Sequence, residues 1–317
     1  MKRYRPPQQL RARAKQTYAS AMSSIALALA LLAAITGAGA AVFQSRGARS
    51  VTPPPSNAAR LLLLLLRKPI WLFGAALAGV SGAFHAGALS RGSLVEVESI
   101  MVTSLLFALA LGIVVTEARV SLRDWFGAIA TIVGLVMFLL FADPQDGVYT
   151  IPTRTAIIGV FTFAIVMTVL VGCAMRSKTP NVRASLFGAS AAVSLGSAAV
   201  MLKVIDTNLA NHNHVLTFLP ALAFLGVCEL GALLLQQVAF RQGSLAAALA
   251  PFIGGNPLVA GAVGIVVFNE RFHHSLGDLL GAIAGIGLVV AGIVVLAASP
   301  LVAAGSGETA NPEIQAS

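Results

Sequence analysis

Long apolar runs constrain this sequence more than any other feature. Nine stretches are each long enough, at about 20 residues, to cross the hydrocarbon core of a bilayer as a helix. They cover residues 21–43, 69–90, 94–115, 124–142, 154–174, 183–203, 215–240, 244–267 and 277–298. Lipid offers no water to satisfy exposed backbone groups, so the runs predict an all-α polytopic membrane protein with nine transmembrane helices.

The overall composition agrees with a membrane location. Hydrophobic residues make up 57% of the 317 residues and charged residues only 10%, against about 25% charged in soluble domains. The formal net charge of +9 raises nucleic acid as a partner, but the Lys and Arg residues are scattered over the tail and the short loops. We therefore expect the lipid bilayer as a partner and no nucleic acid.

The leucine run 61–66 decides the span count. Its six residues are too few to cross a bilayer, and they follow a Pro53-Pro54-Pro55 turn in a loop rich in basic residues. We place the run at the membrane interface, as an approach to the second span. A tenth crossing in this region is the alternative.

Basic residues in the short loops predict the orientation. The side that holds the first loop carries eleven Lys and Arg residues and the other side four, when the N-terminal tail is left out. This bias places the first loop in the cytoplasm and the N-terminus outside. The tail, residues 1–20, carries six further basic residues and opposes that orientation. Translation from Met22 would remove the conflict.

Two parts of the chain resemble each other. Short motifs recur 151 to 154 residues later: Gly92-Ser-Leu94 as Gly243-Ser-Leu245, and Asp124-Trp-Phe-Gly-Ala-Ile-Ala130 as Asp278-Leu-Leu-Gly-Ala-Ile-Ala284. Because one spacer span separates two copies of four spans, the second copy enters the membrane from the opposite side. Inverted repeats of this kind build many secondary transporters, with the substrate site between the copies.

The repeats divide the chain into five segments. These are a basic N-terminal tail (1–20), a first transmembrane repeat (21–142), a spacer helix with its loops (143–182), a second transmembrane repeat (183–300) and a C-terminal tail (301–317). The polar, Gly-containing composition of the last segment predicts disorder.

Ionisable residues inside the apolar runs are the first candidates for function, because each costs about 2.5–3.5 kcal/mol at the centre of a span. Glu229 lies in the middle of the run 215–240, and Gln236 follows seven residues later on the same helix face. His85 corresponds to Gln236 by the repeat offset, 85 + 151 = 236. His85 titrates near neutral pH, so we expect it to relay protons with Glu229; a packing role is the alternative.

The third span of each copy offers further polar groups. Glu96, Ser99 and Thr103 are spaced to share one helix face, whereas Glu98 points elsewhere. In the corresponding run 244–267, Pro251 and the Gly254-Gly255-Asn256-Pro257 segment predict a break in the helix. Asn256 and the unwound carbonyls at such a break can contact an ion or substrate, with a packing kink as the alternative.

Two loops carry a family resemblance. Thr116-Glu117-Ala118-Arg119 and, more closely, Asn269-Glu270-Arg271 resemble the Glu-Arg signature of the drug/metabolite transporter (EamA-like) superfamily. The nine-span layout and the step through Arg67-Lys-Pro-Ile-Trp71 are more similar to the NIPA-type magnesium transporters and their bacterial relatives. The resemblance implies inverted repeats that carry metabolites, drugs or a divalent cation, with Glu117 and Glu270 as structural residues. Ala118, between glutamate and arginine, departs from the signature.

These features favour three functions. The first is a plasma-membrane transporter that moves a small solute by alternating access, with proton coupling through Glu229 and His85. The second is a magnesium transporter in which Glu229, Glu96, Glu98 and Asn256 supply oxygen ligands. The third is a non-transporting scaffold in envelope biogenesis, for which Glu229 and His85 are dispensable. Substrate and oligomeric state stay open, a homodimer included.

An enzyme is not expected from this sequence. It contains no phosphate-binding glycine loop, His-Glu-x-x-His motif or nucleophile elbow. We accordingly expect neither catalytic residues nor a cofactor.

Overall fold

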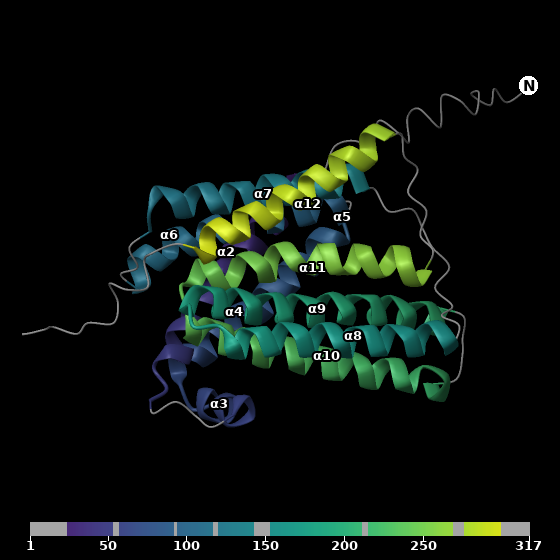
Figure 1. Ribbon diagram of the computed structural model, residues 1–317, viewed down its shortest axis with the longest axis horizontal. Helices are drawn as coiled ribbons and strands as arrows, with labels where there is room; N and C mark the ends of the chain where they lie inside the picture. The colour runs from purple at the N-terminus through teal and green to yellow at the C-terminus, as the bar shows by residue number, and fades with distance from the viewer. Residues whose placement is uncertain are drawn as a thin grey trace, which may run out of the picture.

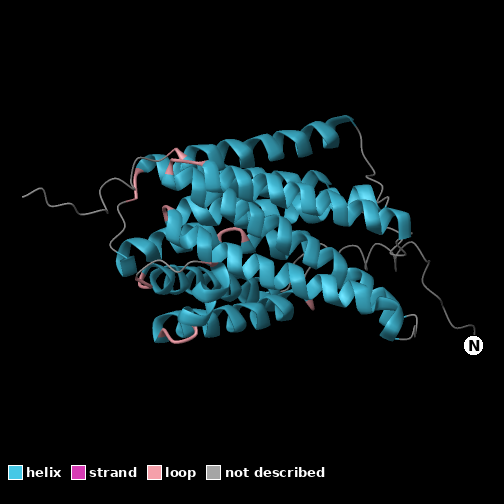
Figure 2. Ribbon diagram, turned by 60° about the horizontal axis from the view of Figure 1, so that its bottom comes forward, coloured by secondary structure: helices cyan, strands magenta, loops and turns pink. Residues whose placement is uncertain are grey.

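The computed structural model of the chain describes residues 24–52, 57–91, 94–116, 120–142, 153–210, 215–268 and 276–298. Every regular element in these ranges is an α-helix, and the helices pack into one elongated bundle (Figures 1 and 2). They are α2 (Ser24–Arg49), α3 (Ala58–Leu65), α4 (Pro69–Leu89), α5 (Leu94–Met101), α6 (Ser104–Thr116), α7 (Leu122–Ala142), α8 (Thr153–Arg176), α9 (Pro180–Ala210), α10 (Val215–Gln242), α11 (Leu245–Phe268) and α12 (Leu276–Ala297).

In the described part of the chain, eight helical stretches are long and apolar enough to cross a membrane, with α5 and α6 counted as one. The fold is that of an all-α polytopic membrane protein, as the sequence predicts. The 31-residue helix α9 is not among the eight. It lies between α8, α10 and α11 (Figure 1), and its buried positions include Ser185, Ser190, Ser194 and Ser197. Because neighbouring helices cover α9, few of its side chains have to meet lipid.

α2 packs antiparallel to α4 and parallel to α6. A Cβ atom added to Gly37 would lie 2.9 Å from the Ser81 hydroxyl, and one added to Gly47 would lie 2.6 Å from the Trp71 Cβ atom. Between these two contacts the residue numbers rise along α2 and fall along α4, so the two helices are antiparallel. Such close backbone approach is how helices associate in lipid, where hydrophobic driving force is absent.

α9 repeats this arrangement later in the chain, packing antiparallel to α10 and parallel to α11. The Ser194 hydroxyl donates to the Cys228 carbonyl at 2.9 Å, and a Cβ atom on Gly243 would lie 2.9 Å from the Ala184 Cβ atom. In the other pair, a Cβ atom on Gly196 would lie 2.9 Å from the carbonyl oxygen of Asn256. We call α2, α4 and α6 the first helix set and α9, α10 and α11 the second helix set. In each set the first helix has one antiparallel and one parallel partner.

α7 and α12 form a further antiparallel pair, along the upper side of Figure 1. A Cβ atom on Gly134 would lie 2.6 Å from the Gly285 carbonyl oxygen, and one on Gly127 would lie 2.8 Å from the Leu296 side chain. α7 begins with a reciprocal cap, in which the Asp124 carboxylate accepts from the Ser121 N–H at 2.8 Å. The Ser121-Leu-Arg-Asp124 motif is thus a helix start.

The directions of α2 and α9 are fixed at one end of the bundle. Arg49, the last residue of α2, donates to the carbonyls of Phe240 and Gly243 at the end of α10. The Ser244 N–H donates to the Asn181 side chain, at the start of α9, at 2.8 Å. α2 therefore ends where α9 begins. We call this end, which holds Arg46, Arg49, Arg176, Arg183 and Arg241, the basic end, and the other the opposite end.

α3 lies at the lower left of Figure 1, where it packs against α10 and α2. The Asn57 side chain caps it by accepting from the Arg60 N–H at 2.8 Å. Leu61 and Leu65 are buried, while Leu63 and Leu66 are exposed. Eight residues span too short a distance to cross a bilayer, so the alternative of a tenth crossing at 61–66 is wrong.

The apolar run 94–115, predicted as one continuous span, is broken in the structure, which the sequence did not predict. α5 ends at Met101 and α6 begins at Ser104. At the break, the Thr103 N–H and hydroxyl both donate to the Ile100 carbonyl, at 2.9 Å and 2.6 Å. Val102 is buried against α7 and α12. The threonine hydroxyl competes for a helix carbonyl, and burial of Val102 compensates for the lost helical geometry.

The break predicted in the run 244–267 is wrong, since α11 is helical from Leu245 to Phe268 with Pro251 and Pro257 inside it. Pro251 has no N–H to donate to the Ala247 carbonyl four residues earlier. The Ser185 hydroxyl of α9 donates to that carbonyl instead, at 2.8 Å. A neighbouring helix therefore satisfies the group that the proline leaves free, and the helix continues.

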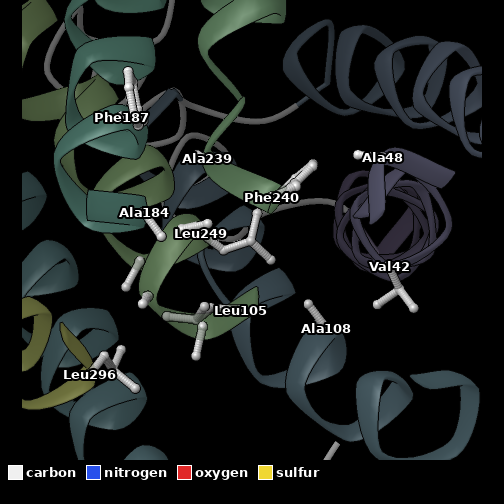
Figure 3. Packing of buried hydrophobic residues seen from close by; sticks show 14 of the residues in the cluster. Val42, Ala48, Leu105, Ala108, Ala184, Phe187, Ala239, Phe240, Leu249 and Leu296 are labelled. Atoms are coloured by element: carbon white, nitrogen blue, oxygen red, sulfur yellow. The ribbon is translucent and has the colours of Figure 1, made fainter. Parts of the chain in front are cut away.

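The largest apolar cluster lies where α2, α6, α10 and α11 converge (Figure 3). Phe240 is fully buried there, with Val42 and Ala48 of α2 on one side and Leu249 of α11 on the other. The same region carries the polar contacts described next.

Candidate functional site

Three buried polar side chains join the two helix sets. The Trp71 indole N–H of α4 donates to the Gln237 Oε1 atom of α10 at 2.9 Å. The Gln237 amide nitrogen donates in turn to the Gln44 Oε1 atom of α2, also at 2.9 Å. Gln237 is 0% exposed and Gln44 6%. A buried amide that finds partners for both of its ends avoids the large cost of an unpaired polar group.

We call Gln44, Trp71 and Gln237 the seam network, since they lie at the seam where α2 and α4 meet α10. Arg49 extends it toward the basic end, with its Nε atom 2.9 Å from the Phe240 carbonyl. A cation at the C-terminal end of a helix also meets the negative end of its dipole. All of these bonds pass from residues before 72 to residues after 236, so they link parts of the chain far apart in sequence.

The sequence did not single out Gln44, Trp71, Gln237 or Arg49 as functional residues. It pointed instead to Gln236, the neighbour of Gln237, which is half-buried in the structure. Adjacent residues on a helix lie 100° apart, and the composition of α10 does not say which of the two amides faces α2. The one feature of the sequence that could have pointed to this network is Gln44, a polar residue directly after an apolar run.

Glu229 lies midway along α10 and is exposed in the bundle. Cys228, one residue earlier, is buried against α9, and Gln237 is buried against α2 and α4. At 100° a residue these two lie on opposite faces of α10, and Glu229 and Gln236 fall in the sector between them. Glu229 therefore lies to the side of α10, between the face against α9 and the face against α2 and α4, and within the described residues it forms no hydrogen bond or ion pair.

The covering of α10 changes along its length. None of residues 219–227 is buried, whereas buried residues recur from Cys228 to Gly243. On the seam side, Leu222 is 43% exposed and a Cβ atom on Gly226 would meet nothing within 4 Å. α10 is thus closely packed toward the basic end and more exposed toward the opposite end, where Phe224 still contacts Phe163 of α8.

His85 pairs with Glu98 near the opposite end. The His85 Nε2 atom lies 2.9 Å from the Glu98 Oε1 atom, and the two side chains are 30% and 24% exposed. Glu98, which the sequence places off the helix face of Glu96, Ser99 and Thr103, meets His85 where the end of α4 lies beside the start of α5. Ala88, one turn after His85, and Val97, next to Glu98 in the chain, belong to a small buried apolar cluster with Ala30 of α2.

This pair is the one combination of predicted site residues that the described structure joins by a hydrogen bond. A histidine next to a carboxylate, half-open to its surroundings, can take up and release a proton. Thr103 lies at the break one turn after Glu98, with its hydroxyl already bonded to Ile100. Asn256 is half-buried on α11, beside α9.

Several predicted residues cannot be placed. Glu117 and Glu270 lie outside the described residues, as do both tails and the loop 143–152. The backbone of Glu96 belongs to α5, but its side chain also lies outside the described part. Across the ranges that are described, no three His, Cys, Asp or Glu side chains gather to hold a metal ion.

Comparisons with protein-family models, with curated proteins and with solved structures find no match to this chain. The resemblance to drug/metabolite transporters therefore rests on the loop motifs, and the geometry of the bundle carries the functional argument.

Proposed function

We propose that this chain is a transporter of the drug/metabolite transporter type, which moves a small solute across the plasma membrane by alternating access. Its architecture would be two inverted four-span repeats joined by α8, with α9 as the ninth span. The pathway would run along the seam, past Glu229 and Gln236.

The observation that carries this proposal is the repeated packing pattern in opposite directions. α2 with its partners α4 and α6 has the same arrangement as α9 with α10 and α11. α2 ends at the basic end and α9 begins there. Two copies related in this way can exchange conformations, which opens the seam first to one side of the membrane and then to the other.

Ionisable groups within the predicted spans also support the proposal. A protein that only holds helices together in lipid gains little from ionisable groups within the membrane, and these are costly to insert. Glu229 and the His85–Glu98 pair both lie within spans, and both are in part exposed. Groups that are costly and accessible are suited to binding a solute or a coupling proton.

We assign proton coupling to His85 and Glu98 in place of a relay between His85 and Glu229. The two groups of the pair are in contact, and histidine is the side chain that in its unperturbed state changes charge near neutral pH. α2, α4 and α5 each contribute one residue, Ala30, Ala88 and Val97, to the buried apolar cluster next to the pair. Glu229 then stays available for the solute.

Purified protein in liposomes tests this function. We expect candidate solutes to flow when a pH gradient is imposed, and Glu98→Gln to uncouple that flow from the gradient. Glu229→Gln should reduce flux with or without a gradient, since it alters the pathway itself. Thr168→Val is the matched control, because its hydroxyl bonds only within α8 and faces away from the seam.

The two alternative functions make different predictions in the same assay. Magnesium flux without solute flux favours the magnesium transporter, although the described residues hold no group of three ligands for a metal ion. Absence of any flux, together with normal stability of the purified protein, favours the scaffold.

A further inference from the structure

The contacts across the seam are unevenly placed. The hydrogen bonds that join α2 or α4 to α10 run from Gln44, Arg49 and Trp71, all in the half of the bundle near the basic end. Toward the opposite end, residues 219–227 of α10 include none that is buried. Among the described residues, the hydrogen bonds that close the seam therefore lie at the basic end.

We propose that the seam network and Arg49 form a latch that holds the basic end closed during transport and must open for the solute to pass. This inference rests on the proposed function. It assigns to four residues a positioning role that neither the sequence motifs nor the comparisons indicate.

The chemistry of the contacts suits a latch. Hydrogen bonds between protein groups can be exchanged for bonds to water, so each adds only a modest net stability. A seam closed by apolar side chains alone would expose apolar surface to water on every opening, at about 25 cal/mol per Å². The latch carries two amides, an indole N–H and a guanidinium, which water can solvate once α10 moves away.

The repeat places no similar group at the opposite end. By the offset of 151 residues, Trp71 corresponds to Leu222, and Gln237 corresponds to Ala86 (71 + 151 = 222; 237 − 151 = 86). A closed opposite end would accordingly be held by apolar contacts. The closures at the two ends then differ in chemistry, and loss of a hydrogen bond should promote opening of the basic end but not of the opposite end.

Thiol labelling tests the latch without any need for a substrate. Ala48 is 0% exposed in the cluster that contains Phe240, so an Ala48→Cys reporter reacts with a polar maleimide only when the basic end opens. The background carries Cys173→Ser and Cys228→Ala, which removes both native thiols. The protein is held in lipid nanodiscs, where both faces are accessible.

We expect Trp71→Phe, which deletes one bond, to raise the labelling rate about fivefold, and Gln237→Leu, which deletes two, about thirtyfold. Ser81→Ala is the matched control. It removes one buried hydrogen bond, from the Ser81 hydroxyl to the Ala33 carbonyl at 2.8 Å, that lies within the first helix set. It should change the rate less than twofold.

The latch is overturned if Trp71→Phe and Gln237→Leu leave the rate unchanged, or if Ser81→Ala raises it as much as they do. A variant that is not monodisperse is replaced by Arg49→Lys, which cannot reach two carbonyls in the fork geometry of arginine. Labelling that responds as expected in a protein without solute flux would remove the proposed function and leave the latch. Solute flux with unresponsive labelling would remove the latch alone.

Discussion

The two ends of the bundle use ionisable and amide groups in different ways. At the basic end, Gln237 is fully buried while Arg49 is exposed, and the bonds of both residues join helices from both sets. At the opposite end, His85 and Glu98 bond within one hairpin and remain in part exposed. Burial with partners from distant segments gives a group a role in holding the fold closed, while partial exposure leaves it free to change its protonation state.

The largest effect should come from filling the helix contact near the basic end. A Cβ atom on Gly74 would lie 2.8 Å from the Gln44 backbone nitrogen and 3.0 Å from the Ala40 carbonyl. Since backbone atoms cannot move aside, we expect Gly74→Ala to destabilise the protein by about 3 kcal/mol. Thermal unfolding in detergent measures it.

Gly87→Ala, on the same helix but near the opposite end, is its control. The nearest atom there is the Leu29 Cδ1 atom at 3.4 Å, which belongs to a flexible side chain. Equal destabilisation by both substitutions would show that the two ends do not differ in packing.

The second-largest loss of stability should come from removing the Arg49 guanidinium at the basic end. Arg49→Ala leaves the Phe240 and Gly243 carbonyls without their donor, and we expect a loss of about 2 kcal/mol in unfolding free energy. Arg46→Ala deletes a bond from the same helix to the Val115 carbonyl at 3.2 Å, which is exposed and stays within the first set. It should cost well under half as much in the same unfolding assay, and a larger loss for Arg46→Ala would contradict the comparison.

A third test concerns Ser185, which bonds to the proline-containing helix α11 near the basic end. Ser185→Ala deprives the Ala247 carbonyl of a donor, and we expect a cost of about 1 kcal/mol. Pro251→Ala restores an N–H four residues after Ala247, so the double variant should recover part of that loss. The double-mutant cycle isolates this coupling.

Ser190→Ala controls for the loss of a buried hydroxyl, because the Ser190 hydroxyl bonds to the Leu186 carbonyl of its own helix turn. If Pro251→Ala affects the Ser185 and Ser190 variants alike, the serine does not replace the missing backbone donor.

The smallest effect on stability belongs to the opposite end. Glu98→Gln weakens a half-exposed pair, and we expect it to lower the unfolding free energy by less than about 1 kcal/mol. Its effect should appear in transport, where the dependence of flux on pH is flattened. Loss of stability as large as that of Arg49→Ala would place His85 and Glu98 among the groups that hold the bundle together.

Comparison of α11 with the pair α5 and α6 shows where sequence patterns misled. Two prolines predicted a break in residues 244–267, and no proline stood in 94–115. The structure has the break at Val102–Thr103 and none in α11. A proline removes one donor, but whether the helix breaks depends on what lies beside the carbonyl left free, and Ser185 comes from a helix some sixty residues away.

The sequence by itself determined that the chain is a bundle of membrane helices, because the length and composition of an apolar run settle whether it can satisfy its backbone in lipid. It also located His85, Glu98 and Glu229 as unusual groups, since the cost of inserting a charge does not depend on the fold. Only the tertiary structure decided that His85 meets Glu98 and that Gln237, not Gln236, bonds to Gln44 and Trp71. Those pairings depend on the rotation and crossing of helices far apart in the chain, which no local pattern encodes.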